Sequence, residues 1–202
     1  MRKNILSTLL TLIVVTLSSS ITVALETDED VRFVREGVDY TQYDKFLIQP
    51  LEISKTRLVP PPWVEGKAGQ PRPWHISQKN ALFLQEQYHA SMKRQLEGKG
   101  GYQLAGEPAS DTLEVEVEII SLTPWADPKD EVTTKGSGEM QIRAEVRDSR
   151  SGEILVIIEG SMPVGEDYHE NTQFSVDQDV EELFESWGEY LRLALNEAKV
   201  KK

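Results

Sequence analysis

The sequence of 202 residues contains no cysteine. This absence excludes disulfide bonds, thiolate metal ligands, cysteine nucleophiles and lipid attachment through a cysteine side chain. Basic residues are also few, because 22 Lys and Arg stand against 34 Asp and Glu and give a formal net charge of −12. An acidic chain of this kind is a poor candidate for binding nucleic acid, since phosphate recognition needs a clustered basic surface.

The motifs of several enzyme classes are also missing. The chain has no Gly-x-Ser-x-Gly for a nucleophilic serine, no Gly-rich phosphate loop and no His-Glu-x-x-His. We therefore predict a protein that is not an enzyme and has no cofactor. A hydrolase that uses acidic side chains in a cleft is the lowest-ranked alternative.

The N-terminus has the three parts of a secretory signal. Arg2 and Lys3 precede an apolar run that ends at Leu17, and small residues follow as far as Ala24. We predict cleavage after Ala24 and a periplasmic product without stable membrane insertion. Its charge falls from −12 to −14, because residues 1–24 carry two positive charges and no negative one. An uncleaved anchor is the alternative, although a spanning helix needs about 20 strongly apolar residues.

The remaining sequence predicts one α/β domain at 36–200, preceded by a polar segment at 25–35. Alternation of apolar and charged residues indicates strands, and apolar residues at helical spacing indicate helices. The expected elements are a strand at 45–53, a helix at 77–97, strands at 113–120, 140–147 and 153–159, and a helix from 175 onward.

Each predicted helix has one apolar stripe, and each alternating strand has one apolar face. We therefore predict an α+β two-layer sandwich in the order β-α-β-β-β-α, with both helices on one face of a mainly antiparallel sheet. If the two alternating strands pair antiparallel, the row of Glu114, Glu116 and Glu118 meets Arg143 and Arg147.

Four short stretches resemble segments of a known family. They read GVDYTQYDKF at 37–46, GYQL at 101–104, DTLEV at 111–115 and DSRSGEIL at 148–155. In order and spacing, residues 36–198 resemble the bacterial envelope family called domain of unknown function 3313. The resemblance implies an exported α/β domain, often lipid-anchored, with no established activity and no catalytic residues. The missing lipobox cysteine departs from that pattern and favours a soluble periplasmic protein.

A proline-rich loop is the first candidate binding site. The stretch at 54–76 holds half of the chain's ten prolines and is locally basic. Trp and Arg are enriched in interface hot spots, and long loops often carry binding functions. We predict that the protein docks an envelope protein partner through the loop at 58–74. The expected contact residues are Trp63, Trp74, Arg57 and Arg72. The alternative is that both tryptophans cover a sheet edge or a helix end.

A second hypothesis places a small-molecule or metal site between the loops at 123–138 and 160–174. The residues expected to line it are Trp125, Tyr168 and His169. His169 also has Asp167 and Glu170 as neighbours, and imidazole with carboxylates can hold a divalent ion. Because this spacing matches no metal signature, we predict no bound metal and keep these three residues as a weaker alternative. Oligomeric state is not specified by the sequence.

Replacing Trp63 and Trp74 by Ala tests the docking loop. The double variant should no longer recover a partner from the envelope fraction, while its thermal midpoint stays close to that of the wild type. A large loss of thermal stability would instead identify the two tryptophans as core residues.

Overall fold

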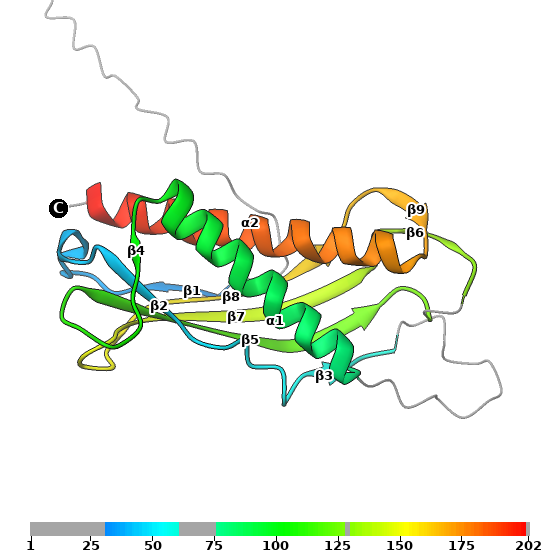
Figure 1. The fold of residues 1–202 in the computed structure, drawn as a ribbon, viewed down its shortest axis with the longest axis horizontal. Coiled ribbons are helices and arrows are strands. Elements are labelled where there is room, and N and C mark those ends of the chain that lie inside the picture. Colours follow the sequence, from blue (N-terminus) through cyan, green and yellow to red (C-terminus); the bar gives the residue numbers. More distant parts are fainter. Residues whose placement is uncertain (1–30, 61–75, 128–129, 201–202) are drawn as a thin grey trace, which may run out of the picture.

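The computed structural model describes residues 31–60, 76–127 and 130–200. In these residues a seven-stranded sheet carries two long helices on one face (Figure 1). The predicted α+β class with two helices is confirmed. The predicted signal peptide and the residues Trp63, Arg72 and Trp74 lie outside the described residues.

The elements have the following bounds. The large sheet contains β1 (Val31–Val34), β2 (Lys45–Ile48), β3 (Arg57–Leu58), β4 (Gln103–Leu104), β5 (Thr112–Pro124), β7 (Gly138–Asp148) and β8 (Ile154–Val164). A separate two-stranded sheet contains β6 (Thr133–Lys135) and β9 (Tyr168–Glu170). The helical segments are the 3₁₀ turn η1 (Tyr40–Gln42), α1 (Gln78–Lys93), its π-helical continuation η3 (Arg94–Lys99) and α2 (Gln173–Val200). No helix in the described ranges is long and apolar enough to cross a lipid bilayer.

The sheet is mixed: most of its paired residues are antiparallel, as predicted, but part of the sheet is parallel, which was not predicted. Its strands follow the order β1-β8-β7-β5-β2-β4, and β3 pairs with the C-terminal part of β5. Pairing is antiparallel from β1 to β5 but parallel between β5 and β2, β5 and β3, and β2 and β4. The reason is that α1 lies between β2 and β5 in the chain, and a helical crossover lets the second strand run in the same direction as the first.

Short strands appear where the sequence predicted loops. Residues 31–34, which were expected in the polar segment before the domain, form the edge strand β1 and pair with β8. The two loops at 123–138 and 160–174 supply β6 and β9, which pair with each other. The predicted order β-α-β-β-β-α is therefore incomplete.

The predicted charge pairing across the sheet is confirmed. In the antiparallel pair of β5 and β7, Glu114 lies opposite Arg147 and Glu118 lies opposite Arg143. The Arg147 Nε atom also lies 3.2 Å from a carboxylate oxygen of Glu116. Their apolar neighbours on β5 and β7 are buried, so the charged side chains occupy the face away from the helices.

The core lies between the helices and the sheet. Its fully buried side chains include Leu84, Tyr88 and Met92 from α1, Leu183, Phe184 and Leu191 from α2, and Val115, Val117, Ile119, Ile142 and Val146 from the sheet. The rings of Tyr88 and Phe184 meet edge to face, with centroids 5.9 Å apart. This contact joins the two helices above the sheet.

The helices approach most closely where Gly188 of α2 faces Gln95 of η3. A Cβ atom at position 188 would lie only 3.0 Å from the Cγ atom of Gln95. The Gln95 side chain is 1% exposed, donates to Glu185 at 2.7 Å and accepts from Arg192 at 3.3 Å. From this contact the two helices diverge toward their N-termini (Figure 1).

The segments that resemble the family meet at the end of the sheet where β2 and β5 begin. The Tyr43 hydroxyl donates to an Asp148 carboxylate oxygen at 2.8 Å, which joins the first segment to the last. Lys45 forms an ion pair with Asp111 at 2.6 Å and joins the first segment to the 111–115 stretch. The other Asp148 oxygen accepts from the backbone amide of Ser151 and closes the turn after β7. These contacts are structural.

The core predicts a contrast between two phenylalanines of α2. Phe184→Ala should lower the free energy of unfolding by about 3–5 kcal/mol, because it leaves a cavity in the core. Phe174→Ala should change it by about 0.5 kcal/mol or less, because that side chain is 77% exposed. Urea denaturation of both variants measures the difference, and equal losses would contradict this placement of α2.

Candidate functional site

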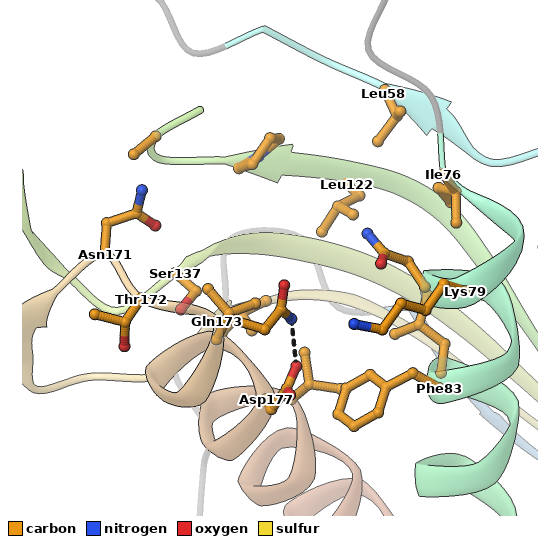
Figure 2. Close-up of a pocket in the computed structure, with 17 residues that line it drawn as sticks. Leu58, Ile76, Lys79, Phe83, Leu122, Ser137, Asn171, Thr172, Gln173 and Asp177 are labelled. Carbon is orange, nitrogen blue, oxygen red and sulfur yellow. Dashed lines mark hydrogen bonds between the residues drawn. The ribbon is translucent and has the colours of Figure 1, made fainter. Parts of the chain in front are cut away.

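A pocket of about 250 Å³ lies above the sheet, where α1 and α2 diverge (Figure 2). Leu58 of β3 and Leu122 of β5 contribute from the sheet, while Phe83 of α1 and Val176 of α2 contribute from the helices. These residues belong to the apolar faces of their elements. Because the helices are apart here, their apolar side chains line the pocket.

Both helices begin beside this pocket. The Ser77 hydroxyl accepts from the Asn80 amide at 3.2 Å and caps α1. The Thr172 hydroxyl accepts from the Ser175 amide at 3.2 Å and caps the first turn of α2. The capping side chains therefore fix where each helix starts and which of its residues reach the pocket.

Polar side chains lie among the apolar lining residues. They are Lys79, Asn80, Ser137, Asn171, Thr172, Gln173 and Asp177. The Gln173 side chain donates to an Asp177 carboxylate oxygen at 2.6 Å, along one side of α2. Figure 2 shows Lys79 reaching from α1 into the space that faces α2. The pocket thus combines apolar walls with a few polar groups, which is the usual composition of a small-ligand site.

A buried carboxylate supports one wall of the pocket. The Asp179 side chain is 8% exposed and accepts hydrogen bonds from the Ser137 hydroxyl and from His169 Nε2, the latter at 2.8 Å. Gly165 has a positive φ of 81°, and a Cβ atom there would overlap the Asp179 carboxylate. Asp179 therefore links α2 to the start of β7, to β9 and to the turn after β8.

Ser137, Asp179 and His169 are the residue types of a hydrolase triad, but their connections differ. In a triad the imidazole lies between the serine and the carboxylate, so that it can take the serine proton. Here one oxygen of Asp179 accepts from both Ser137 and His169. This geometry holds the serine hydroxyl as a donor to the carboxylate and does not place the imidazole on the serine.

His169 is held between two acceptors. Its Nδ1 atom lies 3.0 Å from the Glu170 carbonyl oxygen, and its Nε2 atom lies on Asp179. Both nitrogens can donate only in the protonated ring. Partial burial alone would lower the pKa of His169, but the hydrogen bonds to Asp179 and Glu170 and the negative charges of Asp179 and Asp167 raise it above the ordinary value.

The structure locates the predicted small-molecule site only in part. The loops at 123–138 and 160–174 do reach the pocket, through Pro124, Ala126 and Asn171 among others. Trp125, Tyr168 and His169 are not among its lining residues, and Tyr168 is 77% exposed. Within the described part of the chain no three His, Asp or Glu side chains are grouped to hold a metal ion, the set Asp167, His169 and Glu170 included.

The predicted docking residues are described only at Arg57, which is exposed on β3. Its neighbour Leu58 and the residue Ile76 both line the pocket. Lys79, Phe83 and Gln173 line the pocket but were not predicted as site residues. No local motif marks them, because they share only their places near the N-termini of two helices that are far apart in the chain.

The His169 contact predicts a pH-dependent stability. His169→Gln should lower the free energy of unfolding by about 1.5–3 kcal/mol in acid, the range for hydrogen bonds to charged groups. The folded pKa is raised, so this stabilisation is complete below about pH 6.5, the ordinary value, and is lost as the pH rises through the folded pKa.

Urea denaturation from about pH 5 to about pH 9 measures this difference between wild type and variant. The control is His89→Gln, which replaces an exposed histidine of α1 and should follow the wild type at every pH. A difference that stays constant or grows as the pH rises would contradict the ion pair.

Three solved structures show the range of similar folds. Protein XCC0632 from Xanthomonas campestris is 9% identical with a TM-score of 0.46, covering 78% of this chain and 88% of that one. A PelC dodecamer from Paraburkholderia phytofirmans is 7% identical with a TM-score of 0.40, covering 78% and 97%. A minor lipoprotein from Acinetobacter baumannii is 13% identical with a TM-score of 0.39, covering 75% and 94%. Scores this low carry no information about the function of this chain.

Comparison by sequence gives a clearer result. No curated protein matches the chain. The model of one family, described as protein of unknown function (DUF3313), matches residues 22–191. This range covers most of the chain, including both helices of the pocket and the sheet beneath them. The chain therefore belongs to the DUF3313 family, as its sequence resemblance indicated.

Proposed function

We propose that the protein is an exported, non-catalytic binding protein of the bacterial envelope that holds a small ligand with an apolar part in the pocket between α1 and α2. The observation that carries this proposal is the pocket itself. Its apolar lining favours an apolar ligand, and the polar side chains among that lining can orient it.

The size of the pocket limits the ligand. At about 250 Å³ it is smaller than the roughly 300–1,000 Å³ of pockets for drug-sized ligands. A ligand of a few carbon atoms with one or two polar groups matches this volume. Its burial against Phe83, Leu122 and Val176 would supply the driving force, at about 25 cal/mol for each Å² of apolar surface removed from water.

Two features support a role without catalysis. The sequence has no Gly-x-Ser-x-Gly, no Gly-rich phosphate loop and no His-Glu-x-x-His. The serine that lines the pocket, Ser137, donates to the Asp179 carboxylate, and His169 bonds to the same carboxylate oxygen and not to the serine as a triad would require. The signal-like N-terminus supports export, and the proposed site of action is the periplasm.

Docking of an envelope protein through the loop at 58–74 is the second candidate function. One observation favours it: Leu58, at the start of this loop, and Ile76, just beyond its end, both line the pocket. A protein bound to the loop would therefore lie next to the pocket. The exposed Arg57 adds a positive charge at the same edge of the sheet.

Filling the pocket tests the first function. Val176→Phe places a larger side chain among the lining residues and should abolish binding of small probes that have an apolar part. Suitable probes are benzyl alcohol, 3-methylbutylamine, 4-methylpentanoate and leucine, which differ in their charged groups. Their binding is followed by thermal shift and by NMR shifts of pocket residues.

The matched control is Leu193→Phe, which makes a similar change at a half-exposed position of α2 outside the pocket. This variant should bind the same probes as the wild type. If none of the probes shifts pocket resonances in the wild type, or if Val176→Phe leaves binding intact, the proposed function is wrong.

A further inference from the structure

The two charged side chains of the pocket come from opposite walls. Lys79 lies in the first turn of α1, and Asp177 lies in the second turn of α2. Among the described residues the Lys79 side chain forms no hydrogen bond or ion pair. The Asp177 carboxylate accepts only from the neutral side chain of Gln173. The two opposite charges thus border the same space without neutralising each other.

This arrangement discriminates among ligands by charge. A ligand with only a carboxylate would be attracted to Lys79 but repelled by Asp177. A ligand with only an ammonium group would be attracted to Asp177 but repelled by Lys79. A ligand that carries both groups can place each one beside its opposite charge.

Neighbouring groups strengthen this preference. The N-termini of α1 and α2 both border the pocket and are the positive ends of their helix dipoles, so both favour the carboxylate of a ligand. The chain as a whole has a formal charge of −12, which disfavours a simple anion. Asn80 can supply a neutral donor and acceptor for the polar end of a ligand. Asn171 can supply only its amide oxygen, because its amide nitrogen donates to the carbonyl oxygens of Asp127 and Asp130.

We propose that the ligand is a small zwitterion with an apolar side chain, which is the chemistry of a hydrophobic α-amino acid. Its carboxylate binds at Lys79, its ammonium group binds at Asp177, and its side chain packs against Phe83, Leu122 and Val176. This inference rests on the proposed function, since it names the ligand class of the same pocket.

Three probes with the same branched carbon chain test the charge requirement. Leucine carries both charges, 4-methylpentanoate lacks the ammonium group, and 3-methylbutylamine lacks the carboxylate. Isothermal titration calorimetry should give leucine an affinity about tenfold higher than that of either singly charged probe. A tenfold difference corresponds to about 1.4 kcal/mol, which is within reach of one charge-assisted hydrogen bond.

Two variants assign each charge to its partner. Lys79→Gln should weaken leucine about tenfold and leave 3-methylbutylamine bound at least as well as before. Asp177→Asn should weaken leucine by a similar factor and leave 4-methylpentanoate bound at least as well as before. This crossed pattern would not follow from a general loss of structure, because each variant keeps one probe.

The chain offers a close control for each variant. Glu182→Gln removes an α2 carboxylate that accepts from Gln178 four residues earlier, as Asp177 accepts from Gln173, but lies outside the pocket. Lys99→Gln removes an exposed lysine at the end of η3, outside the pocket. Both controls should bind leucine as the wild type does.

The outcomes separate this inference from the proposed function. If a singly charged probe binds as tightly as leucine, or if both pocket variants keep the wild-type affinity for leucine, the zwitterion is wrong and the pocket function stands. If leucine, both singly charged probes and benzyl alcohol all fail to bind, the proposed function and the inference fail together.

Discussion

The close approach of η3 and α2 at Gly188 determines where this molecule is closed and where it is open. Gly188 has no side chain, so the Gln95 side chain fits against it and makes hydrogen bonds to Glu185 and Arg192. Because the helices are held together there and cross at an angle, they are apart at their N-termini (Figure 1). The pocket occupies that opening, with the sheet beneath it.

A second polar contact stabilises the open end. A helix that has no neighbouring helix loses packing contacts, and the first turns of α2 would be free to move away from the sheet. Asp179 opposes this by accepting hydrogen bonds from Ser137 and His169, which belong to the β7 and β9 segments. Buried networks with all partners satisfied restrict the positions of their elements. These contacts therefore help to hold the wall of the pocket, together with the apolar core to which Val180 belongs.

The sequence was informative wherever a repeating pattern was long enough. The alternation along 113–120 and 140–147 predicted β5, β7 and the meeting of their Glu and Arg rows. The two apolar stripes predicted α1 and α2. In contrast, β1, β6 and β9 have three or four residues each, which is too short for alternation to be distinguished from chance.

The parallel pairing of β2 and β5 shows a different kind of error. The predicted sandwich was built from which faces are apolar, and both parallel and antiparallel sheets satisfy that condition. The position of α1 between the two strands decides the direction. The direction of pairing therefore follows from the order of the elements in the chain and not from which strand faces are apolar.

The pocket could be predicted only as a region. The loops at 123–138 and 160–174 were identified correctly as neighbours of a cavity, but Trp125, Tyr168 and His169 were chosen for their chemistry. A strand side chain points to one face or the other, and Tyr168 of β9 points to solvent. Lys79 and Asp177 line the same pocket because of the angle between the helices, and no sequence pattern specifies this angle.

The stretches that resemble the family and the residues that line the pocket lie at opposite ends of the sheet. The stretches that resemble DUF3313 join β2, β5 and the turn after β7, through Tyr43, Lys45 and Asp148, at the end away from the pocket. They preserve the fold and place no residue among the pocket's lining. The family match therefore predicts the fold, whereas the proposed ligand depends on Lys79 and Asp177, which lie outside those four stretches.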